Sequence, residues 1–228
     1  MKSNPEIIEQ YLNHISAMEF PCIGARASAI KGRADIMVAD NICCPNDDID
    51  ILHFLYRFID NLRNDKNLYT SASVLFRGPK HLTEEEFDRF LWLRLQSLSD
   101  FDASAFGFAK GVSNDPKSSE FCYSLKEEPF FVLALHAGSS RESRKFEYPV
   151  LVFNPHVQFE MLRKSGAYVK MKDIIRNRDV DYSGSVNPML TDFGERSAAY
   201  QFSGRRYESN WKCPFIPNYE KNEHNRTT

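Results

Sequence analysis

Three segments of the chain combine side chains that could do chemistry, and the first follows a run of apolar residues. His136 comes directly after the apolar run 130–135. The turn behind it holds two serines and two arginines, Ser139, Ser140, Arg141 and Arg144. Turns of this kind present backbone N–H groups and hydroxyls to an anion. On spacing alone, the plainer interpretation is favoured, a surface turn with a partly buried histidine.

The second segment places a histidine at the start of an expected helix. Asn154 and Pro155 precede His156, and proline is common at the first helical position, so we expect Asn154 to cap the helix. The positive end of the helix dipole disfavours the charged form of His156, and a neutral imidazole can bind a metal. A plain residue of the first turn is the commoner case.

The third segment is irregular and polar. Residues 183–217 contain many glycines, prolines and asparagines, with Asp192 before Gly194 and with Trp211 and Phe215 as expected anchors. Loops of this composition often bind ligands. A C-terminal segment that merely wraps the core has the same composition, and the two interpretations stay open.

Several familiar signatures are missing from the sequence. It contains no nucleophile elbow, zinc-protease helix, phosphate-binding loop or dinucleotide fingerprint, and no CxxCH motif for covalent haem attachment. The number of cysteines is odd and the chain is not small, so we expect free thiols. These cysteines are Cys22, Cys43, Cys44, Cys122 and Cys213.

Composition and charge exclude several classes of protein. Hydrophobic residues make up 42% and charged residues 26% of the chain, as in ordinary globular proteins. The formal net charge of −2 gives no basic field that would attract nucleic acid. The longest apolar run is too short to cross a bilayer, and the first residues do not form a secretory signal. We therefore expect a cytoplasmic protein without nucleic-acid or membrane partners.

Periodic patterns predict the elements that would position the three segments. Apolar residues at helical spacing predict helices over about 3–19, 49–64, 83–98, 155–166 and 167–178. A capping box formed by Thr83 and Glu86 marks one start, and Asp47 or Asp48 is expected to cap another. Strands are expected over 34–39, 70–76, 121–124, 130–135 and 149–153. Residues 20–25 are expected to form a turn that leads into a short small-residue segment.

The expected fold class is α+β. The connection between the strands 130–135 and 149–153 is short, which favours an antiparallel pair. We expect a single domain over 1–228, with a mixed or antiparallel sheet packed with helices and an irregular C-terminal segment. Its core is expected to span about 15–217 and its frayed tail 218–228.

Seven motifs follow one another in order over about residues 15–217. They lie within 20–25, 135–141, 151–160, 168–179, 187–194, 203–205 and 211–215. In order and spacing they resemble the YqcI/YcgG family. One departure is Ala137 after His136, where the family pattern has a proline.

The resemblance implies a haem enzyme. Characterised members of the family are haem proteins that N-hydroxylate guanidino compounds, including arginine-like amino acids. A non-covalent haem b, a small-molecule substrate and an external electron donor, such as a separate reductase, are therefore expected. One axial ligand must come from histidine or cysteine, and we expect His136 first, His156 second and Cys22 third. The turn with Ser139, Ser140, Arg141 and Arg144 is expected to hold the haem, its arginines pairing with the propionates.

A guanidinium substrate needs an anionic partner. The candidates for this role are Glu160, Asp192 and Glu195, and Asp192 is the first to test. The plainer interpretation of Asp192 is a turn residue before Gly194. The expected function is that of a haem-dependent N-hydroxylase, a monooxygenase. Two alternatives stay open: a haem-binding or sensing protein without oxygenase activity, and a cofactor-free protein that binds a small molecule.

Overall fold

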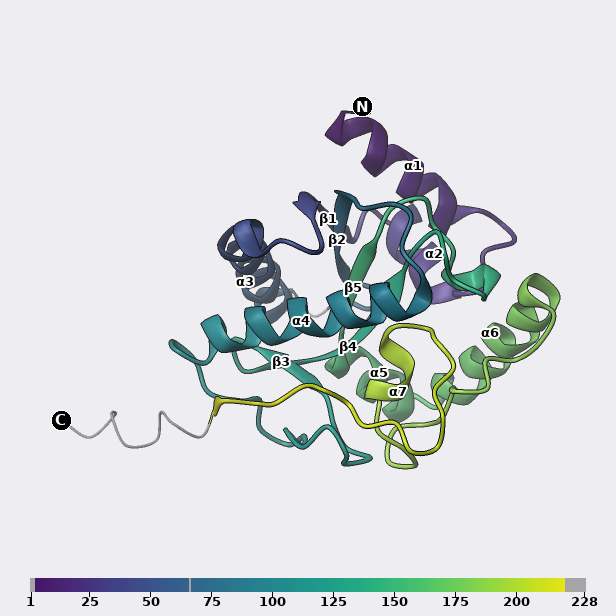
Figure 1. The fold of residues 1–228 in the computed structure, drawn as a ribbon. Coiled ribbons are helices and arrows are strands. Elements are labelled where there is room, and N and C mark those ends of the chain that lie inside the picture. Colours follow the sequence, from purple (N-terminus) through teal and green to yellow (C-terminus); the bar gives the residue numbers. More distant parts are fainter. Residues whose placement is uncertain (1–2, 66, 220–228) are drawn as a thin grey trace.

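The computed structural model describes residues 3–65 and 67–219 (Figure 1). The helices are α1 (Asn4–Ser16), α2 (Ile23–Ile30), α3 (Asp48–Asn64), α4 (Glu84–Asp102), α5 (His156–Lys164), α6 (Ala167–Ser183) and α7 (Ala199–Phe202). The strands are β1 (Ala34–Asn41), β2 (Ser71–Gly78), β3 (Tyr123–Leu125), β4 (Glu128–Leu135) and β5 (Val150–Pro155). Short 3-10 turns cover Pro45–Asp47 and Glu142–Arg144.

The five strands form one mixed sheet in the order β1-β2-β5-β4-β3. β1 and β2 are parallel and are connected through α3, whereas β2 pairs with β5, β5 with β4, and β4 with β3 in antiparallel fashion. The expected α+β fold with a mixed sheet is confirmed, as is the antiparallel pair β4–β5.

Helices cover both faces of the sheet, and alternate strand residues serve the two faces. On one face Val132, Ala134 and Phe153 join a core with residues of α3 and α4. On the other face Leu133 and Leu135 join a core with residues of α1. Each run of consecutive apolar strand residues therefore contributes to two separate cores.

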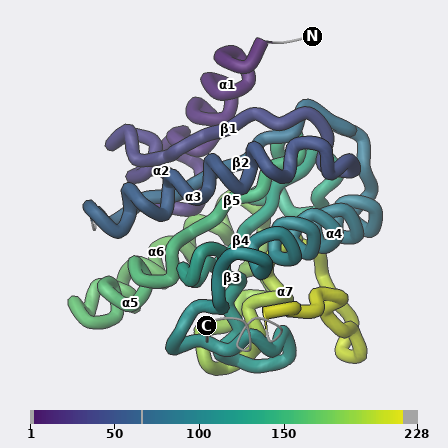
Figure 2. Tube along the Cα trace, turned by 90° about the vertical axis from the view of Figure 1, so that its left-hand side faces the viewer, coloured from purple at the N-terminus to yellow at the C-terminus, as the bar shows by residue number. Residues whose placement is uncertain are grey.

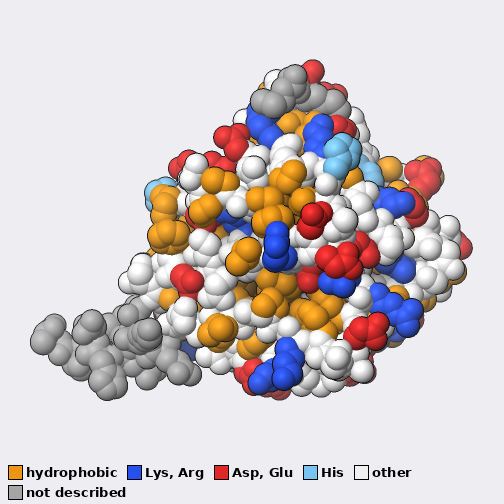
Figure 3. All heavy atoms as spheres, in the orientation of Figure 1, with side chains coloured by type: hydrophobic (Ala, Val, Ile, Leu, Met, Phe, Trp, Pro, Cys, Tyr) orange, Lys and Arg blue, Asp and Glu red, His pale blue; other side chains and the backbone are white. Residues whose placement is uncertain are grey.

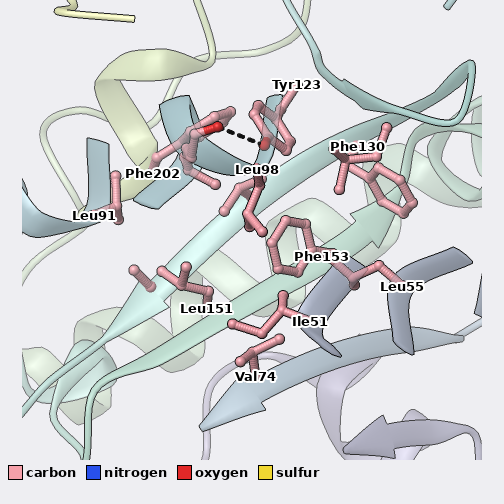
Figure 4. Close-up of a cluster of buried hydrophobic side chains, with 14 of the residues drawn as sticks. Ile51, Leu55, Val74, Leu91, Leu98, Tyr123, Phe130, Leu151, Phe153 and Phe202 are labelled. Carbon is pink, nitrogen blue, oxygen red and sulfur yellow. Dashed lines mark hydrogen bonds between the residues drawn. The ribbon is translucent and has the colours of Figure 1, made fainter. Parts of the chain in front are cut away.

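The core on the α3 and α4 face is rich in aromatic side chains. Phe130 and Phe153 meet edge to face, with ring centroids 6.0 Å apart, beside Leu55 of α3 (Figure 4). Tyr123 is fully buried in the same core, and its hydroxyl donates a hydrogen bond to the carbonyl oxygen of Leu95 in α4. Edge-to-face pairs stabilise a core beyond the area they bury.

Three expectations about the elements are wrong. The segment expected as a turn and a small-residue stretch contains α2, because the Cys22 sulfur accepts the N–H of Ala25 and caps a helix too short to show a period. Asn154 does not cap α5: it belongs to β5, and its amide donates to the carbonyl oxygen of Phe131 across the β4–β5 ladder. Helix α6 extends to Ser183, further than expected, and lies at the edge of the molecule in two views (Figures 1 and 2).

The end of the chain is only partly within the described residues. Phe215 is buried, as expected, and the hydroxyl of Tyr219 donates to the carboxylate of Asp102 and to the carbonyl of Ser124. Tyr219 is therefore anchored rather than frayed. The rest of the expected tail, 220–228, lies outside the described residues.

Acidic and basic side chains are interspersed over the face seen in the space-filling view (Figure 3). This distribution agrees with the near-zero net charge of the sequence. Within residues 3–65 and 67–219, no helix is both long enough and apolar enough to span a membrane.

Candidate functional site

A cavity of about 300 Å³ lies on the α1 and α2 face of the sheet, enclosed by α5, α6 and the C-terminal segment. This volume is at the lower end of the range for small-molecule sites, about 300–1,000 Å³. Its apolar wall comes from α1, from the turn before α2, from the sheet and from α5, through Tyr11, Ile15, Phe20, Phe131, Leu133, Leu135, Val152, Phe159 and Leu162. The wall is therefore assembled from segments far apart in the sequence.

Cys22 brings a thiol to this cavity at the N-terminus of α2. Its sulfur accepts the N–H of Ala25 at 3.4 Å. Burial raises the pKa of the thiol, while the N–H groups of Ala25 and Gly24 and the charge of Arg144 act in the opposite direction. A thiol held by helix N–H groups is suited to become a thiolate when a metal binds, because the metal displaces its proton.

Arg141 and Arg144 also line the cavity. Arg144 donates to the carbonyl oxygens of Ala134 and Gln201, both at 3.2 Å, and burial lowers its pKa to about 10. Arg141 pairs with the carboxylate of Asp179 in α6 at 2.5 Å. Arg144 is thus fixed by neutral carbonyls, and no carboxylate is paired with its charge in the described structure.

The described lining of the cavity carries more positive than negative charge. Five cationic side chains line it, Arg141, Arg144, Arg163, Lys172 and Arg196. Two carboxylates line it, Asp179 and Asp192, and both are in ion pairs. This surplus favours a ligand that carries negative charge.

His156 reaches the cavity as the first residue of α5. Its Nδ1 lies 3.4 Å from the Cys122 sulfur, and its Nε2 lies 3.7 Å from Oε1 of Glu160. The ring of Phe193 lies against it, with centroids 4.7 Å apart. Burial lowers the pKa of His156, in line with the neutral imidazole expected from the sequence.

His136 is directed to the opposite face of the sheet. Because Leu133 and Leu135 face the cavity, the residue after Leu135 points the other way, and its ring stacks on Phe87 of α4 at 4.1 Å. Burial lowers the pKa of His136 to about 4. The structure therefore places the first expected axial ligand outside the cavity lining.

The serines of the expected anion-binding turn are engaged within the protein. Ser140 donates both its N–H and its hydroxyl to the Glu84 carboxylate at 2.9 Å, and the Ser139 oxygen accepts the N–H of Arg141. Neither serine lines the cavity. The turn does bind an anion, but that anion is a side chain of α4.

The expected substrate carboxylates Asp192 and Glu160 differ in position. Asp192 lines the cavity, where Lys172 pairs with it at 2.5 Å and Arg176 lies at 3.6 Å. Glu160 does not line the cavity, and about half of its side chain is exposed. A guanidinium that bound Asp192 would have to displace Lys172.

Some lining residues were missed by reasoning from the sequence. Arg163, Lys172 and Arg196 resemble solvated charges of helices and loops, and Cys122 resembles a small core residue. For Lys172 a signal was present, because it falls within the ordered motif 168–179. Arg163, Arg196 and Cys122 lie near motifs in the sequence, and nothing else in the sequence marked them.

The fit of haem depends on the donor set. No cluster of three or more histidine, cysteine, aspartate or glutamate side chains suited to a metal ion occurs among the described residues. Haem iron needs only one axial protein ligand, and Cys22 and His156 both reach the cavity. Both nitrogens of His156 have protein partners nearby, whereas the Cys22 sulfur accepts one weak hydrogen bond. Apolar walls, two thiols (Cys22 and Cys122) and arginines suit a flat apolar group with carboxylates.

Comparisons with known proteins agree with the motif pattern. The sequence model of the YqcI/YcgG family matches residues 11–216. The protein YcgG of Bacillus subtilis (strain 168) is 28% identical over 217 residues, which are 91% of this chain and 84% of YcgG. The protein YqcI of the same strain is 28% identical over 185 residues, 78% of this chain and 72% of YqcI, and both are described as uncharacterized. No solved structure matches the chain. With a family match over most of its length, the chain belongs to the YqcI/YcgG family.

Proposed function

We propose that this protein is a haem-dependent oxygenase that N-hydroxylates a small amino acid or guanidino compound, with Cys22 as the axial ligand of the haem. The observation that supports the proposal is the position of the Cys22 thiol, at a helix N-terminus on the wall of a cavity that is apolar on one side and cationic on the other. Thiolate ligation favours cleavage of the O–O bond.

The side chains around the thiol have separate roles in this proposal. Leu133, Leu135 and Val152 would line one side of the bound haem and exclude water. Arg144, fixed by two carbonyls and close enough to influence Cys22, would pair with a propionate. Haem, when bound, supplies the oxygen chemistry, and the electrons come from an external donor.

The cationic wall orients the substrate. Arg163 and Arg196 have no carboxylate within ion-pair distance among the described residues, so a substrate carboxylate can bind there. The group to be hydroxylated then points away from this wall. Of the two carboxylates that line the cavity, Asp192 accepts a cationic group only in competition with Lys172.

The test is spectroscopic. The protein is expressed with haem supplied, and ferric and ferrous–CO spectra are recorded for the native chain and for Cys22→Ala, His156→Ala and His136→Ala. We expect a CO band shifted far to the red, as thiolate ligation gives, and its loss in Cys22→Ala alone. Cys213→Ala is the matched control, because this cysteine does not line the cavity.

Each other outcome has a definite meaning. A Soret band lost only in a histidine variant would reassign the ligand. A native protein that takes up no haem would refute the proposal. A haem protein that forms no N-hydroxylated product with reductant, oxygen and a panel of amino acids and guanidino compounds would refute the oxygenase assignment and leave haem binding or sensing.

A further inference from the structure

Three side chains form a line from the surface to the cavity, separate from Cys22 and the arginines. Glu160 is about half exposed, and its Oε1 lies 3.7 Å from Nε2 of His156. Nδ1 of His156, on the far side of the ring, lies 3.4 Å from the sulfur of Cys122. Both His156 and Cys122 are buried, and both line the cavity.

We propose that Glu160, His156 and Cys122 carry protons from solvent into the cavity. This inference rests on the proposed function. Each N-hydroxylation by O₂ consumes two electrons from the external reductant and two protons, and it releases one water molecule. These protons must reach the reacting group inside the cavity, and these three groups join the cavity wall to the surface.

The relay requires one direction for each hydrogen bond. In it, Nδ1–H of His156 donates to the Cys122 sulfur 3.4 Å away, and the thiol S–H is left to donate into the cavity. Nε2 then faces Glu160 and accepts a proton from it, through rotation of the exposed carboxyl or through one bridging water. The proton that enters at Nε2 replaces the proton that leaves from Nδ1, so the imidazole never has to remain charged.

The surroundings of His156 keep its resting form neutral. Glu160 and Arg163, both on α5, bear on the ring with opposite charges, and Phe193 from the C-terminal segment covers it. Burial lowers the pKa of His156 and raises the pKa of Cys122 to about 12. A neutral imidazole beside an un-ionised thiol can pass a proton from one side to the other without either group holding a charge.

The first arm of the test needs no haem. With ¹⁵N-labelled histidine, the ring nitrogens of His156 are assigned by their loss in His156→Gln. We expect an Nδ1–H tautomer whose Nδ1 signal shifts in Cys122→Ala and whose Nε2 signal shifts in Glu160→Gln. The matched control is Asp181→Asn, an exposed carboxylate on α6, which should move neither signal. Signals unaffected by both Cys122→Ala and Glu160→Gln would overturn the proposal.

The second arm uses the haem-loaded protein with reductant and oxygen. We expect His156→Gln and Cys122→Ala to lower product formation about 100-fold, the lower end of acid–base contributions, while hydrogen peroxide release rises and the ferrous–CO spectrum is unchanged. Cys122→Ser, which keeps an O–H donor, should restore coupling. Unchanged coupling in both His156→Gln and Cys122→Ala would overturn the relay. Absence of haem binding would instead refute the proposed function, and the first arm would still report whether the array exists.

Discussion

The strongest prediction from the fold concerns a buried ion pair between α3 and α4. Arg94 and Asp48 are both almost completely buried, and the guanidinium donates to the Asp48 carboxylate. The guanidinium also donates to three carbonyl oxygens at the end of β1 and just beyond it. Those of Asn41 and Ile42 are both at 2.9 Å, and the third is that of Cys44. The other carboxylate oxygen of Asp48 accepts the Ser97 hydroxyl at 2.5 Å. One guanidinium therefore connects the end of β1, the start of α3 and the middle of α4.

Asp48→Ala removes the counter-charge and leaves Arg94 in a site closed to water. Breaking a fully buried pair costs about 3–5 kcal/mol, because the remaining charge has lost both its partner and its hydration. In a chain of this size each kcal/mol lowers the melting temperature by about 2–4 °C, so we expect a decrease of about 8–16 °C for a loss of about 4 kcal/mol. Arg94→Met should cost as much, since it leaves a buried carboxylate.

The assay is urea unfolding followed by circular dichroism, for both single variants and for the double variant. The double variant contains no unpaired buried charge, so we expect it to lose no more unfolding free energy than either single variant. The coupling energy between Asp48 and Arg94 is then about 3–5 kcal/mol. Asp60→Ala is the control: its partner Lys126 lies 2.7 Å away but Asp60 itself is about half exposed, and the loss should stay below about 1 kcal/mol. Single variants that cost no more than this control, or a strictly additive double variant, would refute the reasoning.

Three further predictions follow from the same contacts. Asp179→Asn should cost about 2 kcal/mol in urea unfolding, because Arg141 loses a charged acceptor in a site only about one-tenth exposed, and α6 should become more sensitive to limited proteolysis; an unchanged midpoint would contradict this. His136 has a folded-state pKa of about 4, below its unfolded value, so its unfolded form binds a proton first as pH falls. The contribution of neutral His136 to the free energy of unfolding is complete above about pH 6.5, and about 3 kcal/mol of it is lost by pH 4. The difference in unfolding free energy between the native protein and His136→Phe should change by that amount over this range. Parallel pH profiles for the two proteins would disprove it. Gly138→Ala would bring a Cβ to 2.2 Å from the backbone oxygen of Leu82, so we expect a loss of about 1–3 kcal/mol, against little change in Gly78→Ala, whose Cβ meets nothing.

The elements with long periodic patterns could be predicted from the sequence. Helix α3 begins and ends close to its expected residues. Helix α4 begins at the expected Thr83–Glu86 capping box but extends to Asp102, beyond the expected end at 98. The short helix α2 could not be predicted, because it is capped by a cysteine and its apolar residues show no period. Asp48 is a second instance: its position before a helix suggested a cap, but its partner Arg94 is 46 residues away and only the tertiary fold brings the two together.

The sequence predicted which segments form the site, but not which side chain has which role in it. Cys22, Arg141, His156 and Asp192 come from four separate motifs and line the same cavity, together with Arg144 from the turn after one of them. The side of the sheet that His136 reaches could not be predicted, because every residue of the run 130–135 is apolar. The sequence therefore gives no indication of which residues face α4 and which face the cavity. In a strand buried on both faces, the sequence does not show which alternate residues point to which face. A shift of one residue then decides which side of the sheet a histidine reaches.

The charge on the cavity wall argues that a ligand completes it. Lining cations that outnumber carboxylates five to two repel one another, and this repulsion destabilises the ligand-free protein. A ligand with carboxylates removes the repulsion, and any ligand that binds only the folded state raises stability, by about 2.7 kcal/mol at one hundred times its dissociation constant. Haem should therefore raise the melting temperature more than haem dimethyl ester at the same concentration, because the ester has the same ring without the charges. Equal shifts for the two would mean that Arg144 and its neighbours do not hold the propionates, and that the surplus charge serves the substrate alone.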